Sequence, residues 1–366
     1  MLDDLLHTWP SLRERLDAAA LGDFPTPIER LSTLERELAA GPLYVKRDDR
    51  SALAYGGNKV RTLEVLFGRA RAEGAREIIA TGAFGSNHAV ATVLHARRAG
   101  LAPGAVLFPQ PHSAAAHENF RVTLAHAERL VIVPHWSCVP YGMWRARGAE
   151  RSVMAPGGAT PLGALGYVAA ALELAAQVER GELTAPRRIV VGVGSTCTSA
   201  GLLVGLAHAE RLGFGFRRAP ELVSVRVAPW PVTSRFRILG LAVRASRLLA
   251  DLANDASLSL TRAELAPCLR VDGAELGAGF GKPSPGGRAA IELFRAQAGF
   301  ELDTTYSGKA AAGFLAAARR DPEGPSLFWS TKSTRPLPSV TDAELERAPR
   351  AALRWLARAP RVALPP

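Results

Sequence analysis

Short aliphatic runs alternate with longer amphipathic stretches along most of the chain. The aliphatic runs are rich in Val, Ile and Leu and have the length of buried strands. They cover residues 43–46, 77–81, 105–108, 130–133, 188–192, 222–227 and 326–329. This alternation predicts an α/β fold on mainly parallel sheet, because a crossover helix between two strands lets the second run parallel to the first.

Two of the amphipathic stretches predict helices that pack against the sheets. Leu63, Leu66, Phe67 and Ala70 recur at three- and four-residue spacing, which places them on one helix face. Residues 165–180 repeat the pattern. Each helix therefore has an apolar side for a sheet and a polar side for solvent.

The C-terminal stretch, residues 341–366, is rich in Arg and Ala and carries Trp355 and Leu356 in a helix-like pattern. Such a stretch can pack either on the chain's own core or on a partner protein. We expect it to pack on its own domain.

Length and composition fit one large core or two ordinary ones. Of 366 residues, 48% are hydrophobic and 22% charged, which excludes a disordered or collagen-like chain. No Ser/Gly linker or repeat marks a boundary, so two domains would be joined compactly. Every apolar run is interrupted before the roughly 18 residues that a membrane span needs. The N-terminus opens with acids rather than a secretory signal, so we expect a cytoplasmic protein without a membrane partner.

The net charge of +11 invites a nucleic-acid interpretation, but the distribution of the charge argues against it. Only five of the 45 basic residues are Lys, and the Arg residues are scattered among Ala rather than grouped with aromatics. A solvated basic surface is the simpler interpretation, and we expect no nucleic-acid partner. Because Lys is rare in this chain, each Lys is a candidate for a specific role.

Cysteine and histidine spacing predicts no metal site and no disulfide framework. The three cysteines, at positions 138, 197 and 268, are far apart and form no CxxC pair. The histidines at 112, 117, 126 and 135 have no carboxylate in ligand register.

The first chemical candidate is residues 55–61, YGGNKVR, at the entrance of the helix that contains Leu63. A glycine pair permits a tight turn and a close ligand approach, and Lys59 follows directly behind it. A desolvated lysine amine is a nucleophile that can form a Schiff base. The alternative is an ordinary surface turn, since Gly-Gly-Asn is common there.

The second candidate is residues 81–88, TGAFGSNH, between a strand and a helix. Ser86, Asn87 and the amides of a helix N-terminus are suited to a carboxylate or a ring oxygen. The alternative is that Ser86 or Asn87 is a plain helix cap and His88 a surface residue.

The third candidate is residues 189–203, IVVGVGSTCTSAGLL, which predict a strand, a loop of small residues and a helix. Free backbone amides in such a loop converge on an anion, and the helix dipole favours negative charge. The loop is neither a dinucleotide fingerprint nor a Walker motif, so it fits a single phosphate monoester.

Together, a lysine behind Gly-Gly-Asn, a Ser-Asn helix cap and a small-residue phosphate loop suggest pyridoxal phosphate. At these motifs the chain resembles the fold-type II pyridoxal-phosphate enzymes, the family of 1-aminocyclopropane-1-carboxylate deaminase and D-cysteine desulfhydrase, related to the tryptophan synthase β subunit. The resemblance runs from about Phe24 to about Thr334. Its segments are, in the family's order, residues 24–31, 44–49, 56–61, 86–88, 156–167, 194–201 and 302–309.

The resemblance implies two open, twisted sheets flanked by helices, with the cofactor in a cleft between two domains. The larger domain would comprise residues 1–55 and 171–366 and the smaller one residues 56–170. Family members are commonly homodimers, so a homodimer is expected.

The resemblance also assigns the site. Lys59 would hold pyridoxal 5'-phosphate through a Schiff base. The cofactor-binding residues would be Asn58, Lys59, Asn87, Gly194, Ser195, Thr196, Cys197, Thr198, Ser307 and Thr331. The substrate-binding residues would be Ser86, Asn87, His88 and Tyr306, and the catalytic residues Lys59, Ser86 and Tyr306. Ser307 and Thr331 would lie near the pyridine nitrogen and leave it largely unprotonated, which suits elimination.

Four departures from the family pattern bear on the activity. Phe280 stands where the family usually has a tyrosine, which disfavours opening of a cyclopropane ring. Thr62 replaces a lysine, Thr196 and Cys197 replace a Gly-Gly pair in the phosphate loop, and residues 330–333 read STKS instead of His-Thr-Gly-Gly. At His88 and Ser307 the deaminases carry Gln and Glu and the desulfhydrases His and Thr, so this chain is closer to the desulfhydrases.

The leading hypothesis is a pyridoxal-phosphate dependent lyase that deaminates a small amino acid by α,β-elimination, as D-cysteine desulfhydrase does. One alternative is β-replacement, in which a nucleophile adds to the eliminated product. Another is a non-catalytic binding homologue. Retention of Lys59, Ser86, Asn87 and Tyr306 argues against the last.

Overall fold

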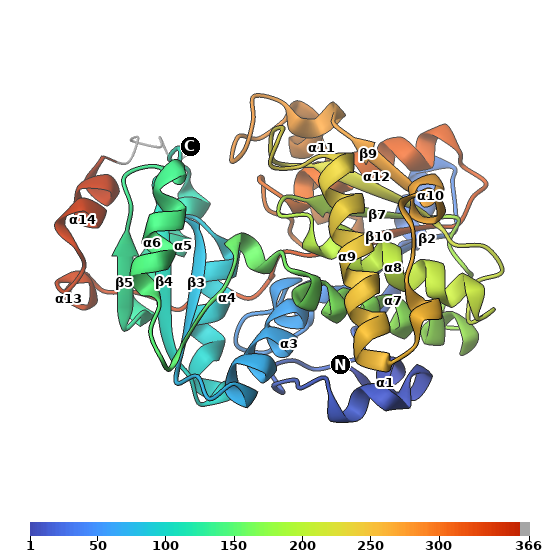
Figure 1. Ribbon diagram of the computed structural model, residues 1–366. Coiled ribbons are helices and arrows are strands. Elements are labelled where there is room, and N and C mark those ends of the chain that lie inside the picture. The colour runs from blue at the N-terminus through green and yellow to red at the C-terminus, as the bar shows by residue number, and fades with distance from the viewer. Residues whose placement is uncertain (359–366) are drawn as a thin grey trace.

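Two mainly parallel sheets with helices on their faces make up the protein, as the sequence predicts (Figure 1). The structure is a computed structural model that describes residues 1–358. The remaining residues, 359–366, belong to the C-terminal stretch and to the expected larger domain, and they lie outside the described part. Helix and strand labels follow Figure 1.

The larger sheet has the strand order β1-β2-β10-β7-β8-β9. Its strands are β1 (Ile28–Arg30), β2 (Leu43–Arg47), β7 (Arg188–Val193), β8 (Glu221–Arg226), β9 (Leu269–Asp272) and β10 (Ser326–Ser330). All neighbours are parallel except β1 and β2. The late strand β10 lies between β2 and β7, so the residues after it reach the middle of the sheet's carboxyl edge.

The smaller sheet is fully parallel and has the order β5-β4-β3-β6. Its strands are β3 (Glu77–Ala83), β4 (Ala102–Phe108), β5 (Arg129–Ile132) and β6 (Arg151–Val153). All seven strands predicted from the sequence are confirmed, and β1, β6 and β9 are additional.

Helices connect and cover these strands. They are α1 (Asp3–Thr8), α2 (Ser32–Leu38), α3 (Lys59–Ala72), α4 (Asn87–His95), α5 (Ala114–His126), α6 (Val139–Ala146), α7 (Pro161–Glu179), α8 (Cys197–Arg211), α9 (Arg235–Ala253), α10 (Arg262–Leu265), α11 (Pro285–Ala298), α12 (Ser307–Arg320), α13 (Asp342–Leu345) and α14 (Arg350–Ala357). The two predicted helices correspond to α3 and α7.

Helix α7 is a core helix, buried from Gly163 to Gln177. It has the length and apolar composition of a membrane span, but 83% of that window is buried inside the protein. Its apolar surface is therefore explained by packing against α3, α8 and α9.

A buried ionic cluster fixes α3 and α7 to strand β2. Arg61 on α3 donates to Asp48 at 2.8 Å and to Glu173 of α7 at 2.8 Å, and Lys46 of β2 also pairs with Glu173. All four residues are at most 2% exposed. Such a cluster is stable only when every charge keeps its partner, so it fixes the direction in which α3 leaves Lys59.

The described part of the C-terminal stretch, residues 341–358, packs on the protein itself, against the layer of the smaller sheet. Trp355 of α14 contacts the rings of Phe84 and Phe120 edge-on, and Figure 1 shows α13 and α14 beside the four-stranded sheet. Residues 171–366 are the second part of the expected larger domain, yet α14 lies on the other layer. Since α3 and α7 also pack across the expected boundary, the domain division stays a prediction.

Candidate active site

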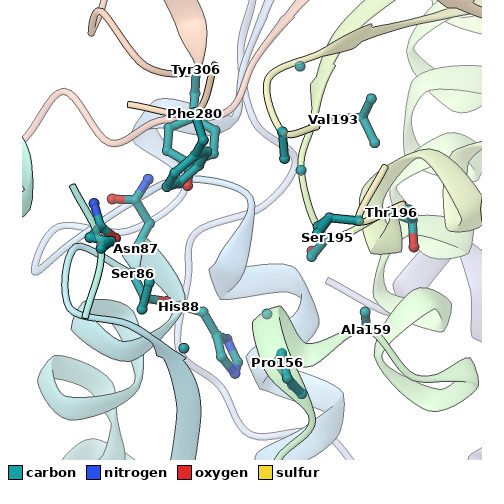
Figure 2. Close-up of a pocket in the computed structure, with 18 of the residues that line it drawn as sticks. Ser86, Asn87, His88, Pro156, Ala159, Val193, Ser195, Thr196, Phe280 and Tyr306 are labelled. Atoms are coloured by element: carbon teal, nitrogen blue, oxygen red, sulfur yellow. The ribbon is translucent and has the colours of Figure 1, made fainter. Parts of the chain in front are cut away.

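A cavity of about 590 Å³ opens where the carboxyl ends of the two sheets face each other. Segments that follow β3, β4, β7, β8 and β10 line it. Open α/β sheets place ligands beyond the carboxyl ends of their strands, and the position of this cavity agrees. In Figure 2, Ser195 and Thr196 lie on one side and Ser86 and Asn87 on the other, with Tyr306 and Phe280 on a third.

Lys59, the first residue of α3, presents its amine to this cavity. Its Nζ donates to the Gly157 carbonyl at 3.1 Å and lies 3.4 Å from Ser195 Oγ. Burial lowers the pKa of the Lys59 amine, because no carboxylate neutralises it in this apolar surrounding. The amine is therefore more often neutral, and more nucleophilic, than an exposed lysine.

The Gly56-Gly57 turn is buried, so the alternative of an ordinary surface turn is wrong. Gly57 has φ +99°, and a Cβ there would lie 2.7 Å from the Thr331 carbonyl oxygen. The close approach lets the Asn58 amide donate to the Thr331 carbonyl at 2.9 Å. Glycine at position 57 thus fixes the lysine turn to the segment after β10.

The loop from Gly194 to Thr198 joins β7 to α8 and lines the cavity at Gly194, Ser195, Thr196 and Thr198. Thr196 has φ +72°, and no side chain caps the N-terminus of α8. The first-turn amides therefore keep their hydrogens for a ligand. Asn58 Nδ2 donates to Thr198 Oγ1 at 2.9 Å, which leaves the Thr198 hydroxyl proton free for the same ligand.

Ser86 both caps helix α4 and lines the cavity. Its Oγ accepts from the Ala89 amide at 3.3 Å, so its hydroxyl proton is free for a ligand in the cavity. The two interpretations of Ser86 as a helix cap and as a binding residue are therefore compatible.

A directed chain of hydrogen bonds orients Asn87. Lys332 Nζ donates to the Tyr55 hydroxyl at 2.8 Å, and that hydroxyl donates to Asn87 Oδ1 at 3.3 Å. Asn119 Nδ2 donates to the same Oδ1 at 2.8 Å. With its oxygen occupied, Asn87 keeps its Nδ2 hydrogens for an acceptor in the cavity, such as a ring oxygen.

His88 lies in the cavity wall and is 1% exposed, so the alternative of a surface histidine is wrong. Burial, together with the nearby Lys59, lowers the pKa of His88 to about 3. The imidazole is thus neutral near pH 7. Neither ring nitrogen has a partner among the described residues, which marks an unsatisfied polar group at the cavity.

Tyr306 and Phe280 form the third side of the cavity, with their rings edge-to-face at 5.8 Å. Burial, the Asp303 carboxylate and Tyr55 raise the pKa of Tyr306, so the phenol stays protonated. Tyr306 can donate a hydrogen bond but is a poor base near neutral pH. Phe280 contributes an apolar face to the cavity beside Tyr306.

Two predicted cofactor residues do not line the cavity. The thiol of Cys197 donates to the Gly158 carbonyl at 3.4 Å, so the Cys197 side chain is not available for a ligand. The Ser307 hydroxyl donates to Asp303 Oδ1 at 2.6 Å. The structure therefore leaves Thr331, which does line the cavity, as the hydroxyl at the predicted ring-nitrogen end.

Sequence reasoning missed Tyr55, Lys332 and Arg237 as functional residues. Lys332 and Arg237 line the cavity, and Tyr55 orients Asn87. The rarity of Lys was the signal that could have selected Lys332. Arg237 is one of many Arg residues, and nothing in its neighbourhood of the sequence distinguishes it.

These features fit pyridoxal phosphate as a ligand. No Asp or Glu is among the described residues that line the cavity, so no carboxylate there opposes a bound phosphate. The uncapped α8 terminus suits the phosphate, the Lys59 amine suits the aldehyde, and Asn87 Nδ2 suits the ring oxygen. The replacements at Thr62, Thr196 and Cys197 do not close the cavity.

Comparison with known proteins agrees with this geometry. Residues 19–331 match the family model described as "Pyridoxal-phosphate dependent enzyme". The chain is 34% identical to D-cysteine desulfhydrase of Salmonella paratyphi B over 84% of this chain and 91% of that protein. It is also 34% identical to nocardicin C-9' epimerase of Nocardia uniformis subsp. tsuyamanensis, over 81% of this chain and 88% of that protein.

Among solved structures, a 1-aminocyclopropane-1-carboxylate (ACC) deaminase homologue aligns over 88% of this chain and 94% of its own. The TM-score is 0.73 and the identity 29%. The family match covers most of the chain and includes the lysine turn, the Ser86 segment and the phosphate loop. This protein therefore belongs to the pyridoxal-phosphate dependent enzyme family and uses that cofactor.

Proposed function

We propose that the protein is a lyase that deaminates a small amino acid by α,β-elimination, with D-cysteine as the first substrate to test. The observation that carries the proposal is the Lys59 amine, which is held against Gly157 and lines the same cavity as Ser86 and Asn87. The similarity to D-cysteine desulfhydrases supports the same reaction class.

The protein's contribution begins with the α-proton of the substrate. Bound pyridoxal phosphate supplies an electron sink for the charge left at the α-carbon. Burial lowers the pKa of the Lys59 amine, which favours its neutral, proton-accepting form, and Gly157 and Ser195 hold that amine in place. The protonated lysine then carries the proton that the leaving group needs.

Ser86 and Asn87 orient the reacting groups in this proposal. The free Ser86 hydroxyl proton is suited to the substrate carboxylate, and Asn87 Nδ2 to the cofactor's ring oxygen. His88 forms part of the cavity wall as a neutral imidazole. The protonated Tyr306 donates a hydrogen bond near the leaving group.

Epimerisation at the α-carbon is a second candidate. Ser86 lies across the cavity from Ser195, which the Lys59 amine approaches, so proton-transfer groups stand on two sides of one space. A second proton donor opposite the lysine would return the proton with inverted configuration. The similarity to an epimerase favours testing this outcome.

The test is product analysis with D- and L-cysteine on wild-type protein and on Lys59→Ala. Elimination gives pyruvate, ammonia and sulfide, and Lys59→Ala should form none of them. Epimerisation instead gives the opposite enantiomer, which carries deuterium at the α-carbon when the reaction is run in D2O. A thioether formed on adding an external thiol would indicate β-replacement, and cofactor binding without turnover of any amino acid would indicate a binding homologue.

We also propose a homodimer located in the cytoplasm, on the basis of the family resemblance. Light scattering after size-exclusion chromatography tests the assembly. A mass of one chain at micromolar concentration would contradict it.

A further inference from the structure

We infer that the outer part of the cavity is a subsite for the β-substituent of the substrate, and that it takes a group with an apolar body and a terminal anion. An S-aryl or S-alkyl conjugate of cysteine that carries a carboxylate has this chemistry. The inference rests on the proposed α,β-elimination and names its leaving group.

Apolar side chains line both sides of the cavity mouth. Trp136 follows strand β5 of the smaller sheet and is 65% exposed, and Val232 lies between β8 and α9 and is 48% exposed. Both belong to the cavity wall while solvent covers much of their surface. A ligand that lies between them would bury this surface, which favours an apolar group by the hydrophobic effect.

Arg237 supplies a cation at the same mouth. It is in the first turn of α9, is exposed and lines the cavity. No salt bridge among residues 1–358 includes Arg237, and no described Asp or Glu lines the cavity. The guanidinium is thus available for an anion from a ligand, and a carboxylate matches its two parallel donors.

The Val232 side of the mouth is anchored to the phosphate loop. The Thr233 hydroxyl donates to the Gly194 carbonyl at 2.6 Å, and Ser234 caps α9 by accepting from the Arg237 amide at 3.3 Å. These contacts fix the start of α9 relative to the loop. Binding therefore needs little ordering of this segment, which preserves affinity.

Phe280 continues the apolar surface inward to Tyr306. A substrate the size of cysteine leaves Trp136, Val232 and Arg237 in contact with solvent. A larger β-substituent uses all three, while its amino-acid end stays with Lys59, Ser86 and Asn87.

The reaction balances for such a conjugate. The Cα–H and Cβ–S bonds break, and the sulfur leaves with its electron pair and takes up a proton as a free thiol. Water then releases ammonia from the remaining three carbons, which become pyruvate. One conjugate and one water give one thiol, one pyruvate and one ammonium ion, with no oxidant or reductant.

The experiment compares three substrates on the holoenzyme: cysteine, S-benzylcysteine and S-(4-carboxybenzyl)cysteine, each in the enantiomer that the enzyme accepts. We expect kcat/KM to rise from cysteine to the benzyl conjugate, and by a further factor of about 10 for the carboxybenzyl conjugate. Arg237→Gln should abolish the gain in kcat/KM of the carboxybenzyl conjugate over the benzyl conjugate. It should leave kcat/KM for the benzyl conjugate unchanged. Trp136→Ala should lower kcat/KM for both conjugates by at least about 3-fold and leave kcat/KM for cysteine unchanged.

Arg244→Gln is the matched control, because Arg244 is exposed on the same helix and does not line the cavity. Equal kcat/KM for the two conjugates, or an equal effect of Arg237→Gln on all three substrates, would overturn the inference. So would a loss of cofactor affinity in Arg237→Gln, since Arg237 would then serve the phosphate.

Binding separates this inference from the proposed reaction. Calorimetry on Lys59→Ala with pyridoxal phosphate should show tighter binding of the carboxybenzyl than of the benzyl conjugate, lost with Arg237→Gln. Turnover of cysteine without this difference in binding affinity would refute the proposed subsite and support the proposed lyase activity. If the two conjugates differ in affinity but no substrate undergoes elimination, the subsite is supported and the lyase activity is refuted.

Discussion

Lys332 Nζ donates a hydrogen bond to the Tyr55 hydroxyl at 2.8 Å, across 277 positions of the sequence. The contact sets the direction of the next one, because a hydroxyl that accepts from an ammonium group directs its own proton at Asn87 Oδ1. Lys332 thus acts on the site through Tyr55, as a positioning residue.

Tyr55→Phe should therefore lower kcat/KM about 5-fold, since one hydrogen bond contributes about 1 kcal/mol. The loss should fall mainly on kcat, with a shift in the visible absorption of the bound cofactor as Asn87 loses one of its two donors. Steady-state kinetics and the absorption spectrum check this. Tyr44→Phe, which removes a hydroxyl contact with Thr184 outside the cavity, is the control and should change neither.

Gly157→Ala should weaken cofactor binding by at least about 10-fold. Gly157 has φ +67°, and a Cβ there would lie 2.5 Å from Ser195 Cβ and 3.8 Å from Lys59 Nζ. The distance to Lys59 Nζ is an ordinary contact, but the phosphate loop at Ser195 must shift. Titration of the cofactor absorption measures the effect.

Gly74→Ala separates backbone strain from this steric clash. Gly74 has φ +79° and nothing within 4 Å of a Cβ, so alanine there costs about 1 kcal/mol of stability without touching the site. Equal cofactor affinity in the two variants would contradict the clash with Ser195.

Trp355→Phe should raise KM about 3-fold with unchanged cofactor affinity. Trp355 Nε1 donates to the Gln110 carbonyl at 3.2 Å, and Gln110 Oε1 accepts from the Gly85 amide at 3.1 Å, directly before Ser86. Phenylalanine keeps an aromatic ring beside Phe84 and Phe120 but has no N–H, which removes about 1 kcal/mol of hydrogen bonding. Trp144→Phe, at a tryptophan 64% exposed on α6, should leave KM unchanged.

Glu173→Gln should destabilise the fold by about 3–5 kcal/mol, because it leaves Lys46 and Arg61 without their shared carboxylate. Burial alone would raise the pKa of Glu173, but Arg61 and Lys46 lower it to about 2. A lowered pKa stabilises the folded state above the unfolded pKa of 4.5. Near pH 7 the contribution is about 3 kcal/mol, and it is lost as the pH falls from 4.5 towards 2.

Urea unfolding at pH 7, 5, 4 and 3 checks the sign. Wild-type stability should fall more steeply than that of Glu173→Gln below about pH 4.5. The exposed Glu118→Gln is the control and should match the wild type at each pH. Parallel pH curves for wild type and Glu173→Gln would show that folding leaves the pKa of Glu173 unchanged and would contradict the ion pairs as its cause.

Strong local patterns made most of the fold predictable. Six of the seven predicted strands are mostly buried aliphatic runs, which a parallel sheet covered on both faces requires, and the edge strand β5 is half-buried. Strands β1, β6 and β9 have three or four residues, contain charges and lie at sheet edges, so hydrophobic periodicity does not mark them.

The site residues were predictable where they follow strands in recognisable motifs. Lys59, Ser86, Asn87, Thr198 and Tyr306 line one cavity as expected. The orientations of Cys197 and Ser307 were not predictable, because they depend on which neighbour takes each thiol or hydroxyl. Pairings such as Tyr55 with Lys332 depend on the strand order, which places β10 beside β2.

The visible absorption spectrum with pyridoxal phosphate tests the central claim most directly, that Lys59 holds the cofactor in this cavity. We predict a cofactor band in the wild type and in Lys282→Ala, an exposed lysine outside the cavity, that is absent in Lys59→Ala and changes when D-cysteine is added. An unchanged band in Lys59→Ala would contradict the assignment of Lys59 and the mechanism built on it.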